Sequence, residues 1–132
     1  MIVIDTHIWI WWVHNHADLK PWMRSALVAN EASGIRVSAI PCWEIARLVA
    51  GGKLDLQMST SDWFSAALAY PGVDWVDLTP EISIDANNLP GWLHKDPADR
   101  IIVATSRILG CKLLTAGGKI LDYINVDVVT PE

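Results

Sequence analysis

Four acidic residues stand where an apolar run ends or where a helix is expected to begin. Asp5 closes an apolar run at the N-terminus, Glu44 lies about one turn into an expected helix, and Asp96 and Asp99 open another. Carboxylates that converge from separate segments repel each other unless a cation lies between them. Oxygen ligands without a cysteine or histidine cluster favour Mg²⁺ or Mn²⁺ over zinc. The residue types therefore indicate a site for a divalent metal ion.

A cation held in this way can activate water and neutralise charge on a phosphoryl group, which is a route to phosphodiester hydrolysis. The same acids also have structural interpretations. Asp96 before Pro97 suits a helix N-cap, and Asp99 would face the positive end of the helix dipole. Considered alone, Asp96 and Asp99 are better explained as helix-capping residues than as catalytic ones. Glu44, considered alone, is better explained as a solvated helix residue. Asp5 differs, because an ionised carboxylate at the end of a buried strand needs a partner.

Short apolar runs alternate with helical patterns along the chain. Strands are predicted at 1–5, 35–39, 73–78, 112–115 and 126–129. Helices are predicted from Thr6, from Asp18 towards Gly34, over 41–50, 60–70 and 80–88, and from Asp96-Pro97 to Gly110. This alternation predicts an α/β/α sandwich, with a mostly parallel sheet of about five short strands flanked by helices. The 132 residues are expected to form a single domain, 1–132.

The predicted order of elements brings the acids to one edge of the sheet. Ligands of open α/β sheets bind outside the carboxyl ends of the strands. Asp5 ends the first strand and Glu44 lies just beyond the second, while Asp96 and Asp99 begin the helix that leads into the fourth. Three separate segments can therefore deliver carboxylates to the same edge.

Composition narrows the functional classes. The chain is 52% hydrophobic and 19% charged, with a net charge of −5. That charge argues against binding nucleic acid through a basic surface, so any activity on RNA would rely on bound cations. No apolar run is long enough to cross a bilayer and no signal peptide is recognisable, so a cytoplasmic protein is expected. Cys42 and Cys111 are expected to be reduced packing residues.

Other candidate residues remain open at this stage. Arg100, directly after Asp99, is equally compatible with a phosphate contact and with a structural ion pair. The histidines show no two-element ligand pattern, so none is assigned to a metal: His7, His14, His16 and His94. Some of the eight tryptophans could meet a partner or stack on RNA bases, although core packing is expected for most. The notable ones are Trp9, Trp11, Trp12 and Trp43.

Four ordered blocks resemble the VapC group of PIN-domain nucleases. They are IVIDTHIWIWW at 2–12, SAIPCWEIARLVAGGKL at 38–54, HKDPADRIIVATS at 94–106 and KLLTAGGKILDY at 112–123. The blocks keep the family's order and spacing over nearly the whole chain. The resemblance implies a PIN-like fold and a Mg²⁺- or Mn²⁺-dependent endoribonuclease, the toxin of a toxin–antitoxin (VapBC) pair.

The resemblance also implies roles for individual residues. It matches three catalytic, metal-binding acids: Asp5, Glu44 and Asp99. Asp96 matches either an auxiliary metal ligand or the helix cap, and the block leaves both open. Thr6 and Thr115 match small hydroxyl positions beside the metal. The implied partners are an RNA substrate, a second copy in a homodimer, and a VapB-type antitoxin whose C-terminal tail enters the acidic groove, often with an Arg opposing the carboxylates.

One position departs from the family pattern. Many relatives carry a fourth acid in a T-A-D-G-K sequence, whereas this chain has Gly117 at the acidic position of TAGGK. Glycine offers no side-chain ligand, so a second metal position should be weakened and activity reduced. The alternative function is therefore a catalytically weakened PIN-fold protein that acts mainly by binding a partner.

Two other classes fit less well. A phosphatase of the haloacid dehalogenase type would need a second Asp at position 7, where this chain has His7. A receiver-like module would need an acidic pair near the first strand, but Ile4 precedes Asp5.

Overall fold

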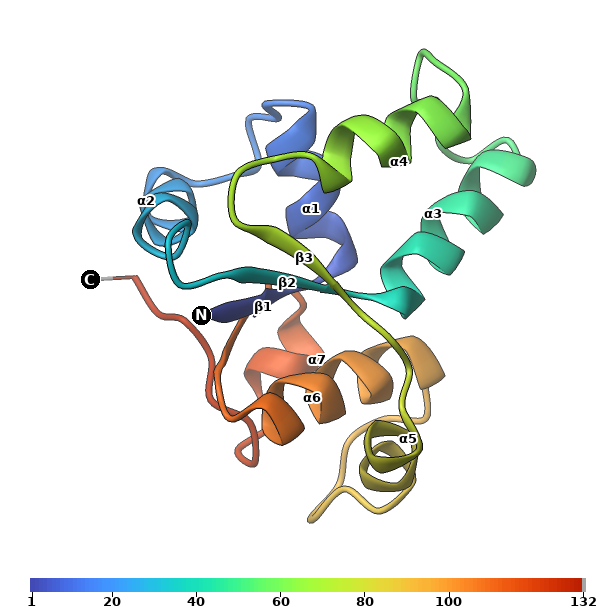
Figure 1. The fold of residues 1–132 in the computed structure, drawn as a ribbon. Helices are drawn as coiled ribbons and strands as arrows, with labels where there is room; N and C mark the ends of the chain where they lie inside the picture. Colours follow the sequence, from blue (N-terminus) through green and yellow to red (C-terminus); the bar gives the residue numbers. More distant parts are fainter. Residues whose placement is uncertain (132) are drawn as a thin grey trace.

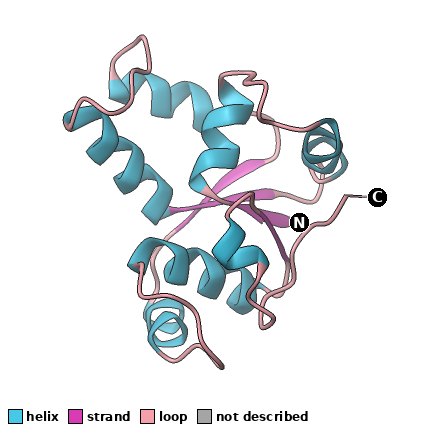
Figure 2. Cartoon of the chain, turned by 180° about the vertical axis from the view of Figure 1, so that it is seen from behind, coloured by secondary structure: helices cyan, strands magenta, loops and turns pink. Residues whose placement is uncertain are grey.

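The computed structural model describes residues 1–131, which are organised around a parallel sheet of four strands. The strands are β1 (Ile2–Ile4), β2 (Ile35–Ser38), β3 (Val73–Val76) and β4 (Lys112–Leu114), in the order β3-β2-β1-β4. In register, Ile2 of β1 lies opposite Ile35 of β2 and Lys112 of β4. Figure 2 shows the sheet between two groups of helices. The predicted α/β/α sandwich is confirmed.

Residues 1–131 contain seven helices. They are α1 (Thr6–Val13), α2 (Pro21–Ala29), α3 (Ala39–Ala50), α4 (Thr60–Leu68), α5 (Pro80–Asn87), α6 (Pro97–Leu109) and α7 (Gly118–Leu121). Helices α1 to α4 cover one face of the sheet, and α5 to α7 cover the other (Figure 1).

Strand β1 is buried on both faces because its side chains alternate between two cores. Ile2 and Ile4 pack with Trp9 and Trp63 in the core on the α1 to α4 side. Val3 points the other way, into the core formed with residues of α6 and α7. A strand covered on both faces needs an uninterrupted apolar sequence, which Ile-Val-Ile provides. Asp5, which follows directly, is thereby fixed at the carboxyl edge of the sheet.

The sheet has four strands rather than about five. The segment predicted as a strand at 126–129 forms one parallel bridge, between Leu113 and Val128. Leu113 supplies both backbone hydrogen bonds, donating to Asp127 O at 2.9 Å and accepting from Val129 N at 2.9 Å. The pairing does not extend into a ladder, so this segment is not a fifth strand.

Helix α2 begins later than the sequence indicated. Asp18 was the expected N-cap, but the helix starts at Pro21 with Lys20 as N-cap and no side-chain cap. Proline presets the helical φ at the first position and disfavours helical geometry in the residue before it, so the helix cannot easily begin earlier. Helix α3 begins two residues earlier than expected, because Ser38 caps it through Ile40 N.

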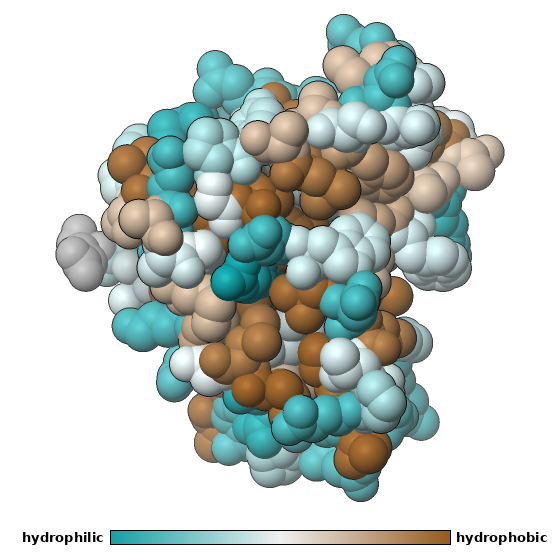
Figure 3. All heavy atoms as spheres, viewed as in Figure 1, coloured by the Kyte–Doolittle hydropathy of each residue, from teal (hydrophilic) through white to brown (hydrophobic). Residues whose placement is uncertain are grey.

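The tryptophans divide between core and surface. Trp9 and Trp63 are fully buried, as expected for packing residues, whereas Trp43 and Trp92 are 58% and 81% exposed. Hydrophobic surface spreads over the face that carries β3 and is broken by hydrophilic residues near its centre (Figure 3). Both cysteines are free and partly buried. No helix within residues 1–131 has the length and apolarity to cross a membrane.

Candidate metal centre

The predicted acids line one cleft at the carboxyl edge of the sheet. The cleft has a volume of about 390 Å³ and contains Asp5, Glu44, Asp96 and Asp99 in its lining, together with Gly117. A larger hollow of about 550 Å³ lies elsewhere, around Met1 and Trp22, and has no acid in its described lining. The four predicted acids therefore lie together in the smaller of these two hollows.

Asp5 obtains the partners that its burial requires. Its side chain is buried and caps α1, with Oδ1 accepting from Ile8 N at 3.0 Å. The Thr115 hydroxyl donates to Oδ2, and the Gly117 N–H donates to Thr115 Oγ1 at 3.0 Å. Burial raises the pKa of Asp5, and the hydrogen bonds from Thr115 and Ile8 lower it in part. Asp5 is thus fixed in position by groups that also favour its charged form.

Glu44 is held by the residue next to Asp5. The Thr6 hydroxyl donates to Glu44 Oε1 at 2.5 Å, which joins the start of α1 to α3. Glu44 is half-buried, and this burial raises its pKa. The charges of Asp96 and Asp99 raise the pKa of Glu44 further. These carboxylates therefore lie close enough to repel each other.

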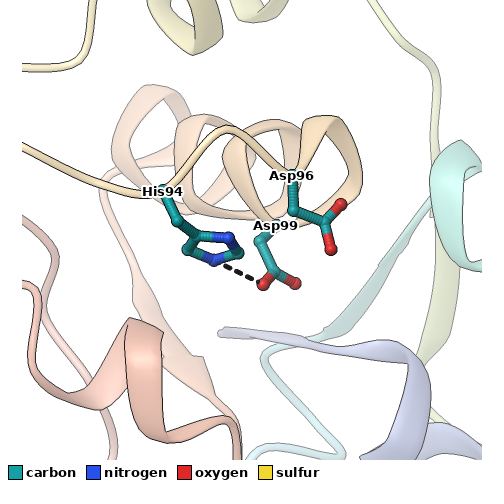
Figure 4. A group of neighbouring side chains, drawn as sticks. All are labelled: His94, Asp96 and Asp99. Atoms are coloured by element: carbon teal, nitrogen blue, oxygen red, sulfur yellow. Dashed lines mark ion pairs between the residues drawn. The ribbon is translucent and has the colours of Figure 1, made fainter.

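Asp96 and Asp99 project from the first turn of α6 (Figure 4). Asp96 is the N-cap, and its Oδ1 accepts from Ala98 N at 3.0 Å. Its carboxylate is also exposed in the cleft, so capping does not remove it from the site. Burial raises the pKa of Asp99, Asp96 raises it further, and His94 lowers it.

His94 joins this group, although the sequence shows no ligand pattern among the histidines. Its Nε2 lies 2.8 Å from Asp99 Oδ2 (Figure 4). The ligand atoms of His94, Asp96 and Asp99 all lie within 4.8 Å of one another. A single histidine two residues before a helix cap has no repeated spacing, so only its nearness to Asp96 in the sequence could have drawn attention to it.

The groups in the cleft fit a divalent cation of the Mg²⁺ or Mn²⁺ type. Carboxylate oxygens dominate, and no cysteine is among the lining residues. Such oxygen ligands suit these ions, and a neighbouring imidazole is compatible with Mn²⁺. Burial raises the pKa of Asp5, Glu44 and Asp99, and a nearby positive charge would lower the pKa of each group again.

Arg100 forms no ion pair with an acid within residues 1–131. Its Nε donates to Ala86 O and its Nη1 donates to Leu93 O, each at 2.9 Å. The guanidinium thus joins α6 to the end of α5 and to the loop before α6, through backbone carbonyls rather than through an acid.

The fold and the cleft define a class of small α/β proteins with a carboxylate-lined site at the carboxyl edge of a parallel sheet. The PIN domain family model matches residues 2–125, and the chain belongs to this family. It is 27% identical over 129 residues to Ribonuclease VapC22 of Mycobacterium tuberculosis, covering 98% of this chain and 96% of that protein. The resemblance inferred from the four sequence blocks is confirmed.

Solved structures share the fold at low sequence identity. VapBC2 from Rickettsia felis, bound to a DNA fragment from its promoter, aligns with a TM-score of 0.71 at 17% identity, over 100% of both chains. DNA-bound VapBC from Salmonella typhimurium aligns with a TM-score of 0.69 at 15% identity, over 97% of this chain and 96% of that one. A toxin–antitoxin complex from Klebsiella pneumoniae aligns with a TM-score of 0.66 at 18% identity, over 100% and 98%.

Proposed function

We propose that this protein is a metal-dependent endoribonuclease toxin that hydrolyses RNA phosphodiester bonds and is neutralised by a cognate antitoxin. The observation that carries the proposal is the convergence of Asp5, Glu44 and Asp99 on one cleft, from the ends of three separate segments. The curated relative is named a ribonuclease, which supports the same reaction. Asp5, Glu44 and Asp99 are the proposed catalytic residues.

Mg²⁺ or Mn²⁺ is the proposed cofactor, and Asp5, Glu44 and Asp99 would hold it, with Asp96 as an auxiliary ligand. When bound, the ion supplies an activated water and neutralises charge on the phosphate. The chain's own contribution is to orient the carboxylates. Thr115 and the Ile8 N–H hold Asp5, and Thr6 holds Glu44. Asp99 is oriented by His94, whose Nε2 lies 2.8 Å away.

The proposed partners are an antitoxin of the VapB type and a second copy of the chain. Several structural neighbours are toxin–antitoxin complexes, which supports the first. An acidic cleft also favours an arginine-bearing peptide, because guanidinium and carboxylate groups form strong paired hydrogen bonds. Exposed apolar side chains such as Trp43 and Ile84 offer area for either partner.

A partner-binding module with weak catalysis is the second candidate, and Gly117 is the observation that favours it. Glycine stands in the cleft lining, where it offers no side-chain ligand to a metal. RNA cleavage would then be slow or absent, while binding of the antitoxin would be retained.

The test is RNA cleavage by the purified protein with Mn²⁺, with Mg²⁺ and with EDTA. We expect cleavage only with a divalent ion, and a loss of about 100-fold or more in Asp5→Asn and Glu44→Gln, as is typical when a group central to metal-ion or acid–base catalysis is removed. Asp127→Asn is the matched control, because Asp127 is exposed and lies outside the cleft lining. Equal cleavage by Glu44→Gln and the parent would refute the catalytic assignment. A parent that binds its antitoxin but cleaves no RNA would favour the binding module.

A further inference from the structure

We propose that a hollow beside the metal cleft binds the nucleotide next to the scissile phosphate, with its base stacked on the indole of Trp92. The hollow has a volume of about 150 Å³ and is lined by Trp92, Leu93, His94, Lys119, Asp122 and Tyr123. We call it the Trp92 hollow. The inference rests on the proposed ribonuclease function and names a substrate subsite of the same cleft.

The Trp92 hollow and the metal cleft are lined by neighbouring residues. On one side, α7 lies between them, because Ile120 lines the cleft and the neighbouring Lys119 lines the hollow. On the other side, His94 lines the hollow and lies 2.8 Å from Asp99, which lines the cleft. A strand whose phosphate sits among the carboxylates would therefore reach the hollow with its adjacent nucleotide.

Trp92 is an exposed aromatic surface on a loop that is held in place. Its side chain is 81% exposed. Two residues before it, Pro90 O accepts hydrogen bonds from the Tyr123 hydroxyl and from Asn125 Nδ2. One residue after it, Leu93 O accepts from Arg100 Nη1 at 2.9 Å. A solvent-facing indole on an anchored loop, beside the proposed catalytic cleft, is suited to stacking on an unpaired base.

The charges of the hollow match a nucleotide better than an apolar peptide. Lys119 forms no ion pair with any residue in 1–131, so its ammonium is available to a phosphate. Asp122 lies in the same lining, and its carboxylate can accept a hydrogen bond from an exocyclic amino group of a base. In a chain with a net charge of −5, a local cation beside an aromatic ring provides the two groups with which proteins commonly bind single-stranded RNA.

The test measures binding of a labelled single-stranded RNA of about ten nucleotides. Fluorescence anisotropy reports the binding, and Ca²⁺ replaces Mg²⁺ or Mn²⁺ to limit cleavage. We expect Trp92→Ala to weaken binding by about tenfold, in the range for loss of one base stack, and Trp92→Phe to retain most of the affinity. Lys119→Gln should lower the slope of log affinity against log salt by about 1. Trp75→Ala is the matched control, because this half-exposed indole lies outside the linings of both hollows.

The outcomes separate this inference from the proposed function. A parent that cleaves RNA while Trp92→Ala binds RNA with unchanged affinity would overturn the subsite alone. A parent that neither cleaves nor binds RNA would overturn both. Loss of antitoxin binding in Trp92→Ala with unchanged RNA affinity would assign the indole to a protein contact and also overturn the subsite. Weaker RNA binding in Trp92→Ala, with a raised KM and a nearly unchanged kcat in cleavage, would support it.

Discussion

The hydroxyl of Thr6 donates to Glu44 Oε1 at 2.5 Å, across 38 positions of the sequence. Thr115 makes the equivalent contact with Asp5, across 110 positions. Each threonine therefore orients an acid that belongs to a different element of the fold. The two hydroxyls thus orient two carboxylates that line the same cleft, which is the kind of preorganisation that the proposed metal site would need.

The metal-free protein should gain stability as the pH is lowered from neutral into mild acid. The folded-state pKa values of Asp5, Glu44 and Asp99 are raised above their ordinary values of 3.8, 4.5 and 3.8. Protonated carboxyls are thus favoured in the folded state. The contribution of these protonated carboxyls to stability is fully present below their ordinary, unfolded-state pKa. It is lost as the pH rises through their raised, folded-state pKa. Thermal melting in EDTA between about pH 5 and pH 8 checks this.

Saturating Mn²⁺ provides the internal control for that pH series. A bound cation favours the ionised carboxylates, so the decline in Tm towards neutral pH should flatten. A Tm in EDTA that is higher at neutral pH than in mild acid would contradict the raised pKa values of these three acids, whose largest cause is burial.

Thr115→Val should destabilise the protein by about 1–3 kcal/mol, the usual cost of leaving a buried polar group without its partner. Thr115 is 1% exposed, and valine keeps its shape while removing the donor to Asp5. Because the lost bond favours ionised Asp5, the cost should grow as the pH rises towards neutral. Urea denaturation at two pH values measures it.

Thr105→Val is the matched control for that substitution. Thr105 is equally buried, but its hydroxyl donates to the backbone oxygen of Ile101, at 2.7 Å, within α6. The loss of stability in Thr105→Val should not vary with pH. Similar pH dependence in the two variants would show that the Thr115 hydroxyl does not act through Asp5.

Gly117→Asp should strengthen Mn²⁺ binding. A Cβ built at Gly117 would meet Thr115 Oγ1 at 3.4 Å, an ordinary contact, and the backbone φ of −72° accepts any residue. The new carboxylate would stand in the cleft lining. Gly118→Asp adds the same charge one residue away, outside that lining and in open space. Calorimetry showing equal gains in both variants would mean that net charge, not a ligand at position 117, is responsible.

Gly72→Ala should destabilise the fold by more than about 2 kcal/mol, through strain and overpacking. Gly72 has a φ of +81°, and an added Cβ would overlap the backbone oxygen of Glu31. Gly52 has a similar φ of +71°, but nothing lies within 4 Å of a Cβ added there. Gly52→Ala should therefore lower the free energy of unfolding by only about 1 kcal/mol. Equal losses of unfolding free energy in Gly72→Ala and Gly52→Ala, measured by urea denaturation, would contradict this prediction. They would show that the structure accommodates the contact with Glu31 without destabilisation.

Features with a strong local signal could be predicted from the sequence. The apolar run ending at Asp5 indicates a buried strand, and Asp96-Pro97 with Gly110 bounds α6 at both ends. Gly110 indeed adopts the left-handed conformation, with a φ of +65°. The position of Glu44 followed from the same logic, because a helix after a parallel strand begins at the carboxyl edge of the sheet.

Features that depend on tertiary contact could not be predicted in this way. His94 has no periodic pattern, and only the folded loop brings its Nε2 to Asp99. The contacts of Arg100 with two carbonyl oxygens depend on how α5 packs on α6. Helix α7 spans four residues, which is too short for hydrophobic periodicity to reveal.

Mn²⁺ binding by titration calorimetry, on the parent and on Glu44→Gln, tests the central claim most directly. The parent should bind Mn²⁺, and the variant should bind at least about tenfold more weakly, because it loses one charged oxygen ligand while its shape is unchanged. Asp127→Asn should bind as the parent does, since its side chain is exposed and outside the cleft lining. Equal affinity in the parent and in Glu44→Gln would contradict the claim that these carboxylates form the metal site.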